Sequence, residues 1–504
     1  MNSKKILLEE LNSVMISDIH QTPERMNATF ERIEEVVALV LRDTQSTGII
    51  KTIETRCHSS SKRAEIDAIQ GEIIVDVVRE CLEHGLLTNT ELASIISLLQ
   101  DAECSTSEAI NMHRDHKIPV SELEADIVPV RGKGAWIIDM KGNKYLDMDS
   151  NYGAANLGFD NKEIAIGLYN QACQLITMKE DRVQIPRTRL MKTLLPLMPQ
   201  GLDQFYWQNS DGEAVDKALK IAKAYTKQKG VIAMLNGFHG RTHGAVAVTS
   251  TLAYRKPFGL DKEDWVHFIQ FNDANALENR LKLGKEKIVI MEIIQSEEGG
   301  ITLAEKDYVK KVRELCTVNK AVLIIDEVQT GFARVAMDEG QWWASDYYGV
   351  IPDIMVIGKS FGGGFPVTAV VTTKGIGSTM KPGYDGSTFG GNPLAMVAAT
   401  IAIKQMKRLS LPKVVASLHK QLVAGLKRIE SPLIRDIRGL GLMIALELPS
   451  KDKVKKFQDE LKKVGVKSSL STGNTVRFLP PLIITKSEID MLIKKTEEAL
   501  RNCR

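Results

Sequence analysis

The sequence lacks paired cysteines, long apolar runs and an excess of charge of one sign. Its six cysteines lie far apart with no Cys-x-x-Cys pair, which indicates reduced thiols in the cytoplasm and argues against a disulfide framework or a zinc site. No apolar run is long enough to span a bilayer. The net charge of +3 gives no electrostatic footprint for nucleic acid or an anionic membrane. We therefore expect a cytoplasmic protein with no metal, nucleic acid or membrane as a partner.

The beginning of the chain also lacks the features of a targeting segment. Glu9 and Glu10 interrupt the apolar stretch that a secretory signal requires, and acidic residues are unusual in a mitochondrial transit peptide. The 504 residues suggest about two to four domains, and a hydrophobic content of 43% is sufficient for a sizeable core.

The pattern of apolar residues divides the chain into a helical part and a mixed part. Helical spacing and capping signals predict helices near residues 22–40, 64–83 and 92–99, and the polar stretch 101–116 is interpreted as a linker. Beyond residue 160, amphipathic helices alternate with strands that are apolar on both faces, at 231–235, 288–291, 321–325 and 354–357. Such alternation predicts an α/β fold with a mainly parallel sheet covered on both sides.

Two polar residues follow directly on buried strands of this predicted sheet. Lys359 precedes three glycines, at the sheet end where open α/β folds bind ligands, and its amine could form a Schiff base. Asp326 could pair with a protonated pyridine nitrogen. Taken singly, Lys359 could equally be a solvated strand-end lysine, and Asp326 could simply cap a turn.

Three further segments have weaker signals. Asp211 and Gly212 open an alanine-rich helix, whose first amides could bind a phosphate or could merely be capped. Phe238 could stack on a planar cofactor and Arg241 could bind a carboxylate, but both could also be ordinary loop residues. Thr388 lies in a turn-rich segment with a hydroxyl that could reach a phosphate.

Together, in this order and spacing, these segments resemble the class III aminotransferases, which include ornithine, acetylornithine, 4-aminobutyrate and putrescine aminotransferases. Asp-Glu-Val-Gln-Thr-Gly-Phe from Asp326 and Gly-Lys-Ser-Phe-Gly-Gly-Gly-Phe-Pro around Lys359 are the most specific matches, and the resemblance runs from about Val128 to the C-terminus. It implies pyridoxal 5'-phosphate (PLP) as the cofactor and the type I PLP fold. It further implies a small α+β domain formed by 117–165 and 395–504 and a large PLP-binding domain (166–394). The helical N-terminal extension (1–105), expected from the apolar pattern, lies outside the resemblance.

The resemblance also implies a role for each matching residue. Lys359 would form the internal aldimine and move the proton, and Asp326 would pair with the ring nitrogen. The other residues that would bind the cofactor are Asp211, Gly212, Phe238, His239, Glu292, Val328, Gln329 and, from the neighbouring subunit of a homodimer, Thr388. The family usually has Gly followed by Ser or Thr where this chain has Asp211-Gly212, so a backbone contact with the phosphate is expected there and not a side-chain contact.

Substrate residues follow from the same resemblance. Arg241 would bind a substrate carboxylate, Arg477 the α-carboxylate of glutamate or 2-oxoglutarate, and Glu297 would neutralise Arg477 while an ω-amino substrate is bound. Tyr152 stands where ornithine aminotransferase has a substrate-recognising tyrosine, although it could be a packing aromatic. The Glu292–Gly300 segment departs from the family's pattern, because it lacks the family's proline and has one extra residue.

The predicted reaction moves the terminal amino group of an ω-amino acid or diamine, with an ornithine-like or lysine-like donor favoured, to 2-oxoglutarate. Two alternatives are a PLP racemase or epimerase of the same family, and a binding or regulatory protein with a degenerate catalytic part. The first would use the same lysine without an amino acceptor.

Overall fold

The computed structural model describes residues 105–470 and 473–503, which fall into two compact units. One unit contains residues 105–131 and 138–144, and the other contains 132–137 and 145–503. Strands β1 (Pro129–Lys133) and β2 (Trp136–Asp139) each cross the boundary between these units. The predicted helices near 22–40, 64–83 and 92–99 lie outside the described residues.

Residues of the predicted linker form a helix, so that prediction is wrong over its described part. Helix α6 (Thr106–His116) begins at Ser105, whose side chain accepts a hydrogen bond from the Glu108 amide. Its first turn contains Glu108 and its last turn is basic, which matches the helix dipole at both ends. None of its residues is buried, so capping and charge, and not packing, stabilise this helix. A search for apolar residues at helical spacing could not detect it.

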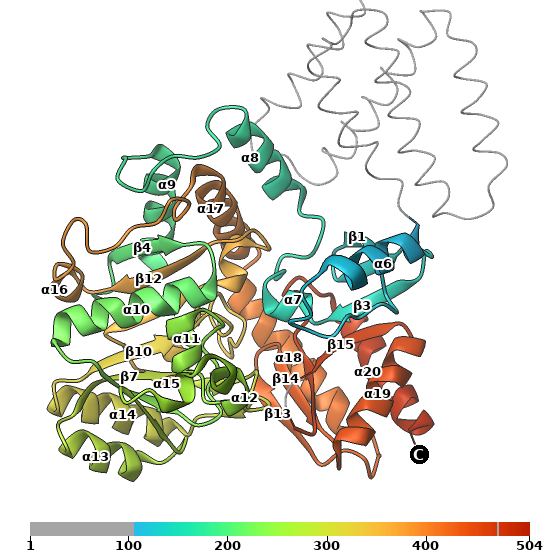
Figure 1. The fold of residues 1–504 in the computed structure, drawn as a ribbon. Coiled ribbons are helices and arrows are strands. Elements are labelled where there is room, and N and C mark those ends of the chain that lie inside the picture. The colour runs from blue at the N-terminus through green and yellow to red at the C-terminus, as the bar shows by residue number, and fades with distance from the viewer. Residues whose placement is uncertain (1–104, 471–472, 504) are drawn as a thin grey trace, which may run out of the picture. The chain divides into compact units, whose positions relative to one another are not determined.

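The larger unit contains a seven-stranded sheet with the order β4-β12-β11-β10-β7-β5-β6 (Figure 1). All neighbouring pairs from β11 to β6 are parallel, whereas β12 runs antiparallel to both of its neighbours. The strands are β4 (Gln204–Gln208), β5 (Gly230–Met234), β6 (Val266–Ile269), β7 (Glu286–Met291), β10 (Val322–Asp326), β11 (Ile354–Ile357) and β12 (Thr368–Thr372). The four buried strands expected from the sequence are β5, β7, β10 and β11.

Helices cover both faces of this sheet because its central strands are apolar on both sides. On β10, Ile324 packs in the same cluster as Ala218 of α10 (Asp211–Thr226). Its neighbour Ile325 points to the opposite face and packs with Val312 of α14 (Lys306–Val318). The period-two alternation of a strand thus accounts for two core layers, and the α/β prediction is confirmed.

The remaining helices of this region connect or flank the strands. They are α8 (Lys162–Ala172), α9 (Ile185–Leu194), α11 (His243–Ala247), α12 (Leu252–Arg255), α13 (Ala274–Lys282), α15 (Ala344–Tyr348), α16 (Lys374–Gly377) and α17 (Pro393–Arg408). Two short strands, β8 (Ile294–Gln295) and β9 (Thr302–Leu303), form an antiparallel pair after β7.

A second sheet combines residues from both ends of the matched region. Strand β3 (Lys144–Met148) pairs in parallel with β15 (Val466–Leu470), and β16 (Thr475–Phe478), β14 (Met443–Glu447) and β13 (Asp436–Leu440) follow in antiparallel order. Helices α18 (Leu411–Lys427), α19 (Lys451–Lys463) and α20 (Lys486–Asn502) share its core, for example through Leu422, Phe457 and Leu492.

Among the helices of residues 105–470 and 473–503, none combines the length and apolarity that crossing a lipid bilayer requires.

Candidate active site

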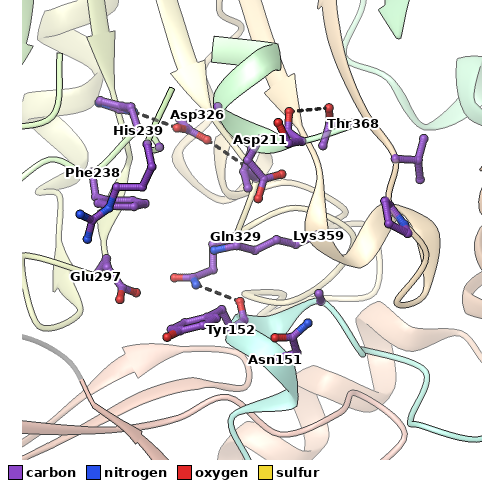
Figure 2. Close-up of a pocket in the computed structure, with 18 of the residues that line it drawn as sticks. Asn151, Tyr152, Asp211, Phe238, His239, Glu297, Asp326, Gln329, Lys359 and Thr368 are labelled. Atoms are coloured by element: carbon purple, nitrogen blue, oxygen red, sulfur yellow. Dashed lines mark hydrogen bonds and ion pairs between the residues drawn. The ribbon is translucent and has the colours of Figure 1, made fainter. Parts of the chain in front are cut away.

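A cavity of about 720 Å³ opens at the carboxyl ends of the parallel strands. Every residue singled out from the sequence as a site residue lines it, except Thr388 and Arg477. Figure 2 shows that the side chains come from several distant segments, with the Asn151–Tyr152 turn opposite the ends of the large sheet. Open α/β sheets bind ligands at this edge.

Lys359 reaches the cavity from a strained backbone position. Strand β11 ends at Ile357, Gly358 is extended, and Lys359 opens a short 3-10 turn, Lys359–Gly362. The φ angle of Lys359 is +44°, which is unfavourable for a residue with a side chain. The lysine is partly buried and lines the cavity. It is therefore not the fully solvated strand-end lysine of the alternative interpretation.

Asp326 lies at the end of β10 and has two neighbours that fix its carboxylate. Its Oδ2 is 2.8 Å from His239 Nδ1, and its Oδ1 accepts a hydrogen bond of 3.1 Å from the Val328 amide. The turn-capping interpretation therefore holds, yet the same side chain also lines the cavity. His239 is buried, and its Nε2 has no hydrogen-bond partner among the described residues. The imidazole and the Val328 amide together fix the orientation of the Asp326 carboxylate.

Polar contacts hold the residues around this carboxylate. Gln329 Nε2 donates to the Tyr152 carbonyl oxygen at 3.0 Å, which joins the large sheet to the turn opposite it. The Phe238 amide donates to Glu292 Oε2 at 2.8 Å. Burial, reinforced by the charge of Asp326, raises the pKa of Glu292 well above its usual value. Glu292 therefore favours its neutral form in this cavity.

The start of helix α10 provides amide donors at one end of the cavity. The first amides of a helix have no acceptor within the helix. Ser210 Oγ accepts a hydrogen bond from the Glu213 amide, whereas Asp211 and Gly212, whose amides have no acceptor within the helix, line the cavity. A Cβ at Gly212 would lie 2.8 Å from Thr242 Oγ1, so glycine is required for this close approach. Backbone amides at a helix start form a suitable phosphate site.

Thr388 does not belong to this cavity. It is exposed in the segment between Asp385 and Asn392, and it does not line the space bounded by the other predicted residues. Within one chain, the structure therefore does not bring Thr388 to the helix start.

Arg477 and Glu297 meet at the other end of the cavity. Arg477 Nη1 lies 2.6 Å from Glu297 Oε2, which lines the cavity, and 3.1 Å from Ser296 Oγ. Arg477 is fully buried, and its guanidinium carbon is 6.0 Å from the centroid of the Tyr152 ring. Its Nε has no acceptor among the described residues.

Arg241 has an aromatic support that the sequence did not suggest. Its guanidinium carbon lies 3.4 Å from the centroid of the Tyr254 ring and 5.4 Å from that of Phe238. Burial raises the pKa of Tyr254, and a hydrogen bond with Glu298 raises it further. The stacked ring restricts the orientation of Arg241 toward the cavity.

The turn that carries Tyr152 was also missed from the sequence. Ser150, Asn151 and Tyr152 have φ angles of +41°, +53° and +55°, although none is glycine. Asp147 accepts a hydrogen bond from the Ser150 amide, and Asp149 accepts one from the Tyr152 amide. Only the short polar run Asp149-Ser150-Asn151 could have suggested a special turn.

The geometry defines the class of protein. A mainly parallel sheet, a lysine after one strand, a carboxylate at the end of its neighbour and helix-start amides suited to phosphate characterise the PLP-dependent enzymes of fold type I. The residues fit a phosphorylated pyridine aldehyde, because they offer an amine, an anion and a phosphate cradle in one cavity.

Comparison with known proteins gives the family. The model of the family Aminotransferase class-III matches residues 118–500, so the chain belongs to the class III aminotransferases. It is a PLP-dependent aminotransferase, as the sequence predicted, and the alternative of a protein without enzyme activity is set aside.

The relatives include aminotransferases for several related substrates. The chain is 35% identical over 379 residues to a [LysW]-aminoadipate semialdehyde transaminase of Deinococcus radiodurans, which covers 75% of this chain and 86% of that protein. It is 32% identical over 403 residues to an ornithine aminotransferase of Brevibacillus brevis, covering 78% and 96%. The solved ornithine aminotransferase of Toxoplasma gondii superposes with a TM-score of 0.76 at 28% identity, covering 81% of this chain and 97% of that one.

Proposed function

We propose that this enzyme transfers the terminal amino group of an ω-amino acid or diamine, with an ornithine-like or lysine-like donor favoured, to 2-oxoglutarate. Glutamate and an aldehyde are the products. The observation that carries the proposal is the Arg477–Glu297 ion pair beside Tyr152.

This ion pair provides a way to accept two unlike substrates. A fully buried guanidinium without a counter-ion is unfavourable, so Arg477 needs an anion in every state of the enzyme. Glu297 supplies that anion while an ω-amino donor without a nearby carboxylate is bound. When 2-oxoglutarate enters, its α-carboxylate replaces Glu297 on Arg477, whose Nε still lacks an acceptor within the described residues.

The proposed cofactor contacts follow the cavity from sheet to helix. Lys359 Nζ would hold the cofactor and would move a proton at the reacting carbon of the substrate. Asp326 would pair with the ring nitrogen and Gln329 with the ring hydroxyl, and Val328 and Phe238 would pack against the ring. When bound, PLP supplies an electron sink for the charge that develops at the substrate carbon.

The remaining contacts orient the phosphate and the substrate. The Asp211 and Gly212 amides bind the phosphate, while Arg241 binds a donor carboxylate and Tyr152 the donor itself. His239 acts through Asp326, and Glu292 orients the Phe238 backbone. The names of the relatives, which include ornithine and aminoadipate semialdehyde substrates, support a donor of this length.

We also propose a homodimer in which Thr388 of each chain completes the phosphate site of its neighbour. The exposure of Thr388 and its absence from the cavity lining of its own chain support this arrangement. The cytoplasmic location stays a prediction.

A panel of donors tests the proposal directly. The purified enzyme with PLP is given ornithine, lysine, N-acetylornithine, putrescine or 4-aminobutyrate together with 2-oxoglutarate, and released glutamate is measured. We expect the highest kcat/KM with ornithine or lysine. Absence of glutamate with every donor, together with α-hydrogen exchange and racemisation in the absence of any 2-oxo acid, would instead identify a racemase.

A further inference from the structure

The side chain of Asp211 occupies a position that the proposed function does not use. Asp211 opens helix α10 at the phosphate end of the cavity, where a carboxylate directed at a phosphate would repel it. Its carboxylate is instead directed at the segment that carries Lys359, as the surroundings of Gly358 show (Figure 2).

Gly358 and Asp211 fit together closely. A Cβ at Gly358 would lie 2.2 Å from Asp211 Oδ1 and 3.4 Å from Asp211 Cγ, so the carboxylate fills the space that any other residue at 358 would need. Gly358 is buried, and the next residue, Lys359, adopts the left-handed conformation. The contact therefore lies at the exact start of the strained turn that directs the lysine into the cavity.

Electrostatic interactions also link the start of helix α10 to the turn that carries Lys359. Burial raises the pKa of Asp211 to about 6, while the ammonium and the backbone N–H of Lys359 lower it and the charge of Asp326 raises it. Lys359 and Asp326 are thus the charged groups that act on Asp211, and Glu292 is a further acid lining the cavity. Of the three acids Asp211, Asp326 and Glu292, Asp211 is the one that helix α10 contributes.

We propose that Asp211 is a positioning residue for Lys359, which packs against Gly358 to fix the lysine-bearing turn and places a negative charge beside the bond between Lys359 and the cofactor. The inference rests on the proposed role of Lys359. It gives the unusual Asp211-Gly212 pair a function: the two amides remain available for phosphate while the side chain serves the lysine.

The charge is tested by the pH dependence of the visible absorbance of the holoenzyme. A neighbouring carboxylate stabilises the protonated, cationic form of the lysine–cofactor linkage and so raises the pH at which it loses its proton. Asp211→Asn keeps the shape and removes the charge, and we expect the midpoint to fall by about one pH unit or more. Asp216→Asn, a partly buried carboxylate on the same helix outside the cavity lining, is the matched control with an unchanged midpoint. An Asp211→Asn midpoint equal to that of the wild type overturns the charge role.

The packing is tested by a double-mutant cycle. Gly358→Ala places a methyl group against the Asp211 carboxylate, and we expect the affinity for PLP, measured by equilibrium dialysis, to fall about tenfold or more because overpacking displaces the turn. Asp211→Gly with Gly358→Ala removes the clash with the carboxylate and leaves only the 3.0 Å approach to Thr368 Cγ2, so it should recover most of that loss. Equal losses in the single and the double variant would show that Asp211 does not pack against this turn.

Lys359→Ala separates failure of this inference from failure of the proposed function. The visible absorbance band of the cofactor-bound enzyme is measured before and after borohydride treatment. If Lys359→Ala retains a band that borohydride removes, Lys359 is not the cofactor lysine and the proposed function fails. If that band is lost while the Asp211 variants behave like the wild type, only the role of Asp211 fails.

Discussion

Arg477 Nη1 and Glu297 Oε2 lie 2.6 Å apart although 180 residues separate them in the chain. Strand β16 supplies the arginine, and the connection after β8 supplies the glutamate. The guanidinium is fully buried and the glutamate side chain is 27% exposed, so Glu297 is the partner that can move away into the cavity.

Glu297→Gln is expected to change the selectivity between substrates. Without a negative charge at position 297, Arg477 is left unpaired unless a substrate carboxylate binds, so KM for 2-oxoglutarate should fall and KM for the ω-amino donor should rise, each by about tenfold. Steady-state kinetics with both substrates varied measures the two constants. Glu447→Gln, which removes one of the two acidic partners of Arg438, is the control and should leave the ratio of the two KM values unchanged.

Asp326→Asn is expected to leave the fold intact and to reduce turnover by about a hundredfold or more, because a neutral amide cannot stabilise the cationic ring nitrogen. Stopped-flow measurement of the half-reaction with donor alone provides the rate. Asp353→Asn is a matched control, since Asp353 accepts from the Leu323 amide at the other end of β10. Normal turnover in Asp326→Asn would contradict the assigned role.

Glu327 is expected to support the site through stability and not through chemistry. It is fully buried, and its carboxylate accepts hydrogen bonds from the Ala344 amide, from the Ser345 amide and hydroxyl, and from Thr330. In Glu327→Gln, the NH2 group of the new side chain would face N–H and O–H donors that need an acceptor. The free energy of unfolding should therefore fall by about 1–3 kcal/mol. Urea unfolding measures the change. An unaltered denaturation midpoint would show that the network tolerates the amide.

Asp147 is expected to make stability depend on pH. Burial raises its pKa from 3.8 to about 7, although Lys467 lowers it. Because the folded pKa lies above the unfolded one, the stabilising effect of this group is fully present below about pH 3.8 and is lost as pH rises through about 7. Asp147→Asn should therefore gain thermal stability relative to the wild type as the pH is raised from 5 to 8. The exposed Asp264→Asn serves as control and should show no such trend.

Part of the site was readable from the sequence because it depends on local order along the chain. Lys359 and Asp326 each follow a buried apolar strand, and parallel neighbours bring their carboxyl ends to one edge. The motif resemblance added Gln329 and the pairing of Arg477 with Glu297, which no local pattern could reveal.

What the sequence did not reveal depends on tertiary contacts or on capping. Arg334 is one example: it is fully buried and donates to the carbonyl oxygens of Leu442, Pro480 and Gly153, which lie in three distant segments. Burial lowers its pKa to about 9. The stacking of Arg241 on Tyr254 and the charged ends of α6 were missed for the same kind of reason, since neither follows an apolar period.

The left-handed turn at Ser150–Asn151–Tyr152 has a consequence for substrate binding. The side chains of Asp147 and Asp149 hold the backbone of this turn without any substrate present. The turn therefore loses its conformational entropy during folding and not when a substrate binds. Binding free energy at Tyr152 can then go into discrimination between donors, because none of it is consumed in ordering the loop.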